Sequence, residues 1–209
     1  MSAQLSSVTE GVNTGQRLTG STAANHGDIG DEAVDLSYSN SASTTRGATG
    51  TASTAMGEGT TASGDYSTAM GESTTASGYY STAMGSYTNA SGWYSTAMGS
   101  VTTASGSRST AMGDGTDASD YASLSIGRYN SVNSTVTAGG SATSFDTDNA
   151  ALVIGNGTGS STKSDAFVVY FNGNATLSGD LTINSDARLK DNIQPLGSTL
   201  NKLHQIEGK

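Results

Sequence analysis

The residues Ser53-Thr54-Ala55-Met56-Gly57 open the pattern that decides the fold of this chain. Four further copies, each fourteen residues after the last, begin at Ser67, Ser81, Ser95 and Ser109. A sixth copy, Ser123-Leu124-Ser125-Ile126-Gly127, keeps the spacing with Ile126 in place of methionine. Disordered low-complexity sequence has no reason to hold one bulky residue at a fixed period, so the repeat predicts a solenoid.

A second motif of the form Thr-x-Ala-Ser-Gly recurs half a period later. It contains Ala62-Ser63-Gly64 in one coil and Ala76-Ser77-Gly78 in the next. Both motifs are short runs bounded by glycine, which suits strands and is too short for helices. Each period is therefore predicted to form one coil of two strands and two tight turns, and stacked coils would pair their strands in parallel.

The composition limits what such a solenoid can do. The 209 residues include 28 Gly and no Cys, and only 33% are hydrophobic, against about 45–50% in an average domain. This excludes an ordinary enzyme core, and no stretch reaches the roughly 18 apolar residues of a membrane-spanning helix. The net charge of −9 argues against binding nucleic acid. We therefore expect a non-enzymatic protein with no cofactor or metal, no nucleic-acid partner and no membrane insertion.

Side-chain alternation assigns the faces of the strands. Ala55 and Ala62 would face each other across a very thin interior, and Met56 would point outward. A stripe of exposed methionine is a continuous apolar patch, which soluble monomers rarely tolerate. We therefore expect chains to associate through this stripe, although the stripe does not itself give their number. The predicted seam consists of Met56, Met70, Met84, Met98, Met112 and Ile126.

The spacing and residue types of residues 33–136 resemble the head repeat of trimeric adhesins of the YadA type. The strand in that family reads Ser-Val-Ala-Ile-Gly, so Thr and Met here replace Val and Ile. The resemblance implies an all-β fold, a trimeric left-handed parallel β-roll, and therefore a homotrimer. Ala33-Val34-Asp35-Leu36 lies where the first strand is expected, which makes the first coil a twenty-residue variant.

The segment 181–193 contains Ser-Asp-x-Arg-x-Lys-x-x-Ile. It is similar to the start of the intramolecular chaperone domain of phage endosialidases and tail fibres, peptidase family S74. In that family the chaperone drives trimerisation of the fibre and then cuts itself off. The resemblance implies cleavage between Ser185 and Asp186 by a dyad of Ser185 and Lys190, in which the amine activates the hydroxyl. Residues 185–209 would be a truncated start of that domain, so at most a longer parent would cleave itself once.

Four segments are expected in all. Residues 1–32 would form an attachment or cap segment, 33–136 the roll, 137–184 a β-rich neck, and 185–209 the start of the chaperone. A short helix after Pro195 would complete this last segment.

The neck contains three expected strands, 151–155, 166–171 and 174–177, and a second turn at 178–180 leads into residues 181–184. Asn172-Gly173 predicts a hairpin turn after the second one. By alternation, Phe167, Val169 and Phe171 would face inward.

Aromatic residues mark one turn of three successive coils. Tyr66, Tyr80 and Tyr94 occupy the same position, with Tyr79 and Trp93 beside them. This ladder either binds a glycan or protein receptor by stacking or stabilises the turns by pairing between coils. Ser107-Arg108 takes the position in the next coil, so the patch is expected to be short.

A column of threonine offers another alternative. Thr60, Thr74, Thr88, Thr102 and Thr116 recur with the period. They either form a flat ice-binding array or are ordinary strand residues.

Together these patterns favour a fibre module of a phage tail or a tail-like injection particle. Joined to a tail or baseplate component, it would contact a glycan or protein receptor, so its location would be a virion or an extracellular particle. One alternative is a trimeric adhesin on a bacterial cell surface, and another is a self-cleaving fibre precursor. Residues 1–30 lack the charged region and apolar core of a signal peptide, which favours the fibre.

Overall fold

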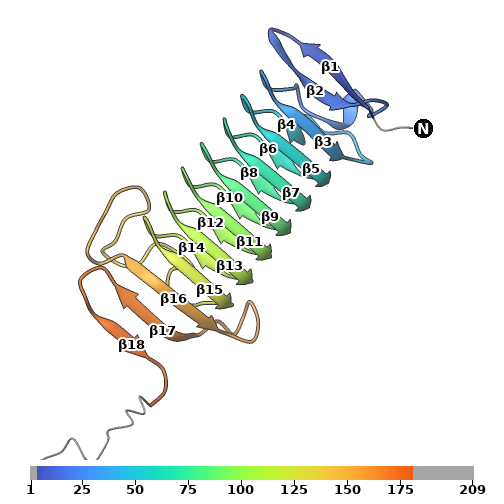
Figure 1. Ribbon diagram of the computed structural model, residues 1–209. Coiled ribbons are helices and arrows are strands. Elements are labelled where there is room, and N and C mark those ends of the chain that lie inside the picture. Colours follow the sequence, from blue (N-terminus) through green and yellow to red (C-terminus); the bar gives the residue numbers. More distant parts are fainter. Residues whose placement is uncertain (1–3, 181–209) are drawn as a thin grey trace, which may run out of the picture. The chain divides into compact units, whose positions relative to one another are not determined.

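The computed structural model describes residues 4–180, and they form an all-β solenoid (Figure 1). Its coils form two sheets, one of twelve strands and one of six, and the strands of successive coils pair in parallel. The only helix among the described residues is a short 3-10 turn, Ala23–Asn25, and none there is long and apolar enough to cross a membrane. The expected C-terminal helix and the residues 185–209 lie outside the described part of the chain.

The long sheet follows the order of the chain along the solenoid. Its strands are β1 (Leu5–Glu10), β2 (Asn13–Leu18), β3 (Val34–Tyr38), β5 (Thr54–Glu58), β7 (Thr68–Glu72), β9 (Thr82–Ser86), β11 (Thr96–Ser100), β13 (Thr110–Asp114), β15 (Leu124–Arg128), β16 (Ala150–Asn156), β17 (Asp165–Tyr170) and β18 (Ala175–Leu177). The short sheet consists of β4 (Gly47–Ala48), β6 (Thr61–Ala62), β8 (Thr75–Ala76), β10 (Asn89–Ala90), β12 (Thr103–Ala104) and β14 (Asp117–Ala118).

Register within the coils is uninterrupted. Met70 pairs with Met84 and Ala69 pairs with Ala83, and the same relation holds from β5 to β15. The first coil is longer, because Val34 pairs with Thr54, as the twenty-residue variant predicted. Identical residues therefore stack in columns along the solenoid.

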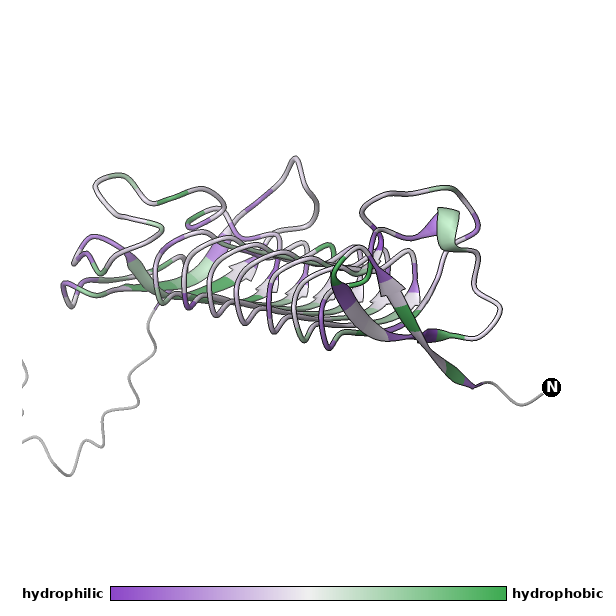
Figure 2. Ribbon diagram, turned by 90° about the horizontal axis from the view of Figure 1, so that it is seen from above, coloured by the Kyte–Doolittle hydropathy of each residue, from purple (hydrophilic) through white to green (hydrophobic). Residues whose placement is uncertain are grey.

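The interior consists of stacked columns of small side chains, as the alternation predicted. Ala55, Ala62 and their counterparts in each coil are at most 1% exposed. The Thr60 column is also buried, so these threonines cannot form an ice-binding surface, and that alternative is wrong. The coils are pale in Figure 2 because Ala, Ser, Thr and Gly have intermediate hydropathy.

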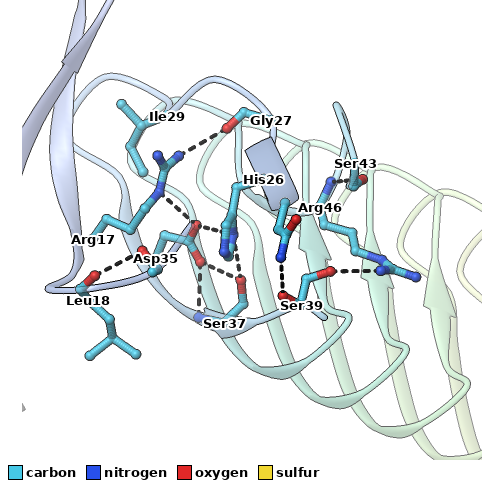
Figure 3. A network of polar contacts seen from close by, with 12 residues as sticks. Arg17, Leu18, His26, Gly27, Ile29, Asp35, Ser37, Ser39, Ser43 and Arg46 are labelled. Carbon is cyan, nitrogen blue, oxygen red and sulfur yellow. Dashed lines mark hydrogen bonds and ion pairs between the residues drawn. The ribbon is translucent and has the colours of Figure 1, made fainter. Parts of the chain in front are cut away.

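The N-terminal end is covered by a hairpin that the sequence patterns did not predict. β1 and β2 pair antiparallel, and β2 continues the long sheet by pairing parallel with β3. A buried polar cluster lies where the hairpin meets the first coil (Figure 3). Arg17 forms ion pairs with Glu10 at 2.8 Å and with Asp35 at 3.3 Å, and it also donates a hydrogen bond to the Gly27 carbonyl oxygen. Residues 1–32 therefore include a cap on the solenoid.

At the other end, side chains replace the next strand of the short sheet. Asn133 Oδ1 accepts hydrogen bonds from the backbone N–H groups of Ser119 and Asp120. The buried Asp120 carboxylate accepts from the N–H and hydroxyl of Thr137 and from the N–H of Ala150. Asp120 stands where earlier coils have glycine, so loss of that glycine marks the last complete coil.

The long sheet continues through the neck. β16 pairs parallel with β15, and β17 and β18 follow antiparallel, with the predicted turn at Asn172-Gly173. The predicted inward residues are wrong in phase: Phe171 is 36% exposed, and Phe167 and Val169 are only partly buried. Val168 is buried instead, because the register of β17 places it opposite the buried Val153.

Candidate functional site

An apolar stripe runs along the outer face of the long sheet. Neighbouring strands pair Leu36 with Met56, Ile126 with Ile154, and Ile154 with Phe167. The complete row is Leu36, Met56, Met70, Met84, Met98, Met112, Ile126, Ile154, Phe167 and Leu177. The residues of the predicted seam therefore form one uninterrupted row, and Phe167, which was expected to face inward, extends it.

The stripe is partly open to solvent in one chain and widens at its C-terminal end. Met56 and Met98 are each 38% exposed, and the other methionines of the stripe are half-buried. Beside the row, the threonines of the coils give way to Leu124, Leu152 and Val169, which are paired in register. Such a contiguous apolar surface is typical of an interface between chains.

The aromatic ladder is stacked as the sequence predicted. The rings of Tyr66 and Tyr80 are parallel at 4.7 Å, and those of Tyr80 and Tyr94 at 5.4 Å. Tyr79 packs edge-on against all three. A hydrogen bond to Tyr80, followed by burial, raises the pKa of Tyr79 to about 12. The ladder therefore pairs the coils, which is the stabilising role that the sequence left open.

The same residues also present a surface. Tyr66, Tyr80 and Tyr94 are each 45–47% exposed, and Trp93 is 63% exposed. The three tyrosines have φ between +55° and +59°, where glycine would be less strained. The turns thus carry aromatic rings despite a backbone cost, and these rings are open to a ligand.

Arg108 extends the ladder beyond the expected patch. Its guanidinium lies 5.3 Å from the ring centres of both Tyr94 and Tyr121, and it donates a hydrogen bond of 3.0 Å to the Tyr121 hydroxyl. The contiguous aromatic rings are therefore few, as expected, and Arg108 joins them to Tyr121. A cation placed one coil after an aromatic residue was the signal that pattern reasoning overlooked.

A cleft of about 640 Å³ lies at this end of the ladder. Trp93, Tyr94 and Arg108 line it together with Thr143, which comes from the long connection 129–149 between β15 and β16. Serine hydroxyls from the coils complete its wall. The cleft combines rings, hydroxyls and one cation, and the repeat pattern gave no sign of it because Thr143 lies outside the repeats.

One buried cluster has the residue types of a hydrolase without its geometry. In the cap, the Ser37 hydroxyl donates directly to Asp35 at 2.6 Å, and His26 Nδ1 faces both residues. A catalytic histidine would hold serine and aspartate on opposite ring nitrogens. The three residues are at most 6% exposed, so they act in packing. The implied dyad of Ser185 and Lys190 and the Ser185-Asp186 bond lie outside the described residues.

The stacked coils have the period and the paired motifs of a known family. Residues 48–130 match the YadA head domain repeat. The matches are overlapping two-copy windows at residues 48–74, 62–88, 76–102, 90–116 and 104–130. This YadA-like head supports an adhesin-type module and the homotrimer that the resemblance implied.

No curated protein and no solved structure matches the chain. The match to the YadA head repeat therefore covers only coils of the roll. The cap, most of the connection 129–149 and the neck lie outside it.

Proposed function

We propose that this chain is a non-enzymatic, trimeric fibre module that binds a receptor on a cell surface. The observation that carries the proposal is the uninterrupted apolar stripe on the outer face of a YadA-like head. Three stripes meeting on an axis would bury it, and burial of each methionine is worth about 1.5–3 kcal/mol. The aromatic ladder would then remain on the side of the fibre for contact with a cell-surface glycan or protein.

The fibre most strongly favoured is that of a phage tail or a tail-like injection particle. This part of the proposal depends on the resemblance of 181–193 to the start of an S74 chaperone. It implies a tail or baseplate component as a partner and a virion or extracellular particle as the location. Heads of the YadA type equally suit a trimeric adhesin on a bacterial surface, which is the second candidate.

Cell binding tests the function. Fluorescently labelled chain is incubated with candidate host cells, and bound label is measured with and without an excess of unlabelled chain. Saturable binding that unlabelled chain displaces is expected. Labelling of intact particles with antibody to the chain, viewed by electron microscopy, separates a tail fibre from a cell-surface adhesin. Absence of saturable binding to every cell type tested would remove the receptor-binding role.

Self-cleavage of a longer parent is tested separately. Mass spectrometry should find an N-terminal product that ends at Ser185, and Lys190→Ala should abolish it, since the amine would activate the hydroxyl. A Ser185 product that persists in Lys190→Ala would exclude the dyad.

A further inference from the structure

We propose that the cleft beside Trp93 and Arg108 binds a carboxylated saccharide. The inference rests on the proposed function, because it names the chemistry of the receptor that the ladder contacts. The cleft has a volume of about 640 Å³, within the range of roughly 300–1,000 Å³ typical of small-molecule sites.

The aromatic wall suits the apolar face of a sugar ring. Trp93 is 63% exposed, and Tyr94 is 47% exposed although its ring stacks on that of Tyr80 and meets that of Tyr79 edge-on. Trp93 contacts Tyr79 only in a tilted arrangement at 6.0 Å, which leaves most of its ring free. An amphipathic ring that is half-exposed at the mouth of a cleft is a suitable stacking platform.

Arg108 supplies the cation. Among the described residues that line the cleft it alone is charged, and no carboxylate of residues 4–180 lies within ion-pair distance of it. The rings of Tyr94 and Tyr121 fix its guanidinium, and only one donor is used, toward the Tyr121 hydroxyl. A positioned guanidinium with free donors favours a planar carboxylate, which it binds through two parallel hydrogen bonds.

The remaining wall supplies hydroxyl groups and a fixed boundary. Ser91, Ser105 and Thr143 line the cleft and are exposed, so they can exchange hydrogen bonds with sugar hydroxyls. Thr143 belongs to the connection 129–149, and connections of that length without strands or helices are usually either functional or flexible linkers. Backbone hydrogen bonds of 2.8 Å, from Ser107 to Ala142 and from Tyr121 to Ser141, attach this connection to the coils.

Binding of purified oligosaccharides to the full chain tests the proposal. The probes are 3′-sialyllactose, a glucuronic acid disaccharide, and lactose as the neutral counterpart. We expect at least one carboxylated probe to bind about tenfold or more tightly than lactose, because a charge-assisted pair to arginine is lost with the carboxylate. Arg108→Gln should abolish the preference, and Arg108→Lys should restore part of it. Trp93→Ala should weaken binding of every probe that binds.

Tyr87→Ala is the matched control. Tyr87 is 59% exposed but lies in the turn that follows β9, outside the residues that line the cleft, so this variant should bind like the unaltered chain. Circular dichroism confirms that each variant keeps its β-structure. Equal binding of acidic and neutral probes, or a preference that survives Arg108→Gln, would overturn the proposal. Sulfated lactose that binds as tightly as the carboxylated probes would also overturn it, because the site would then select charge alone.

The cell assay separates this proposal from the function on which it rests. Cell binding that persists in the double variant Trp93→Ala/Arg108→Gln would overturn the cleft as receptor site and leave the attachment function intact. Preferential binding of a carboxylated probe by a chain that binds no cell would support the cleft and remove the attachment function.

Discussion

Glycine at one position of each coil sets how closely the backbones approach. Gly85 has a φ of +125°, which L side chains rarely adopt, and a Cβ there would overlap the carbonyl oxygen of Gly99 in the next coil. The same relation recurs in the neighbouring coils. The repeat therefore needs glycine for both conformation and space, and no other residue can meet both demands.

Gly85→Ala is expected to lower the free energy of unfolding by about 3 kcal/mol or more, because coil spacing and backbone must both yield. Gly59→Ala is the control, since its φ is +63° and the nearest atom to a Cβ lies 3.6 Å away. It should cost only about 1–2 kcal/mol. Urea denaturation measures the free energy of unfolding of both variants. Similar losses would show that the close approach of neighbouring coils does not contribute to the effect of Gly85→Ala.

A buried threonine hydroxyl predicts a substitution that raises the free energy of unfolding. Thr88 is 1% exposed, and its Oγ1 has no hydrogen-bond partner among the described residues. Burial of an unpaired hydroxyl is unfavourable, and valine has nearly the same shape. Thr88→Val should therefore stabilise the chain by about 1 kcal/mol in the same urea experiment. Thr75→Val is the control, because Thr75 is partly exposed in the short sheet, away from the stripe. A loss of more than about 1 kcal/mol would mean that the hydroxyl is satisfied.

At the scale of the strands, stability depends on how the two ends of the solenoid are capped. An open solenoid end exposes unpaired backbone groups that would template further pairing. The N-terminal hairpin covers one end, and the side chains of Asn133 and Asp120 replace a strand at the other. Both caps depend on buried polar side chains that bond to distant parts of the chain. A single substitution of such a side chain can therefore disrupt the cap.

Asn133→Ala should destabilise the chain by about 2 kcal/mol, because the buried N–H of Asp120 loses its acceptor and the N–H of Ser119 keeps only its 3.2 Å hydrogen bond to the backbone carbonyl of residue 133. Amide hydrogen exchange should rise first in β14 and β15, the strands nearest the cap. Asn40→Ala should change neither, because Asn40 is exposed and its side chain makes no hydrogen bond to the described residues. Uniform exchange across all coils would contradict a local cap.

The N-terminal cap should weaken in acid. Its ion pair with Arg17, reinforced by the backbone N–H of Ile29, lowers the pKa of Glu10 below the ordinary 4.5. The contribution of this carboxylate is therefore complete above about pH 4.5 and is lost as the pH falls through the lowered value. Unfolding measured from neutral to acid pH should show that Glu10→Gln is destabilising at pH 7 and that the difference from the unaltered chain shrinks below about pH 4.5. A difference independent of pH would exclude this linkage.

At the scale of the whole molecule, the apolar stripe is the surface through which we expect the chains to associate. It runs from Leu36 to Leu177 across ten strands of the long sheet, whereas the interior contains mainly alanine, serine and threonine. The thin interior of one chain contributes little apolar burial against the cost of ordering its backbone. Stability should therefore depend on the contact between chains.

Met84→Asp is expected to dissociate or unfold the assembly, because it places a charge at the centre of the stripe. Light scattering should show the loss of the trimer mass. Val101→Asp is the control, since Val101 is 52% exposed in a turn and does not belong to the stripe. An unchanged mass for Met84→Asp would show that the stripe is not the contact between chains.

The sequence by itself determined the solenoid, its period, and which residues face inward or outward in the coils. These features repeat, and each copy of Ser-Thr-Ala-Met-Gly confirms the phase of the one before it. It also predicted the first twenty-residue coil, the stripe and the positions of the ladder aromatics.

Only the tertiary structure decided how the two ends of the solenoid are capped, which face of β17 is buried, and where the cleft lies. Val168 is buried instead of Phe167 because β17 takes its register from β16, and local alternation cannot supply that choice. Arg108 and Thr143 meet because the connection 129–149 folds back on the coils. These features depend on single contacts between residues distant in the chain, which a periodic pattern does not encode.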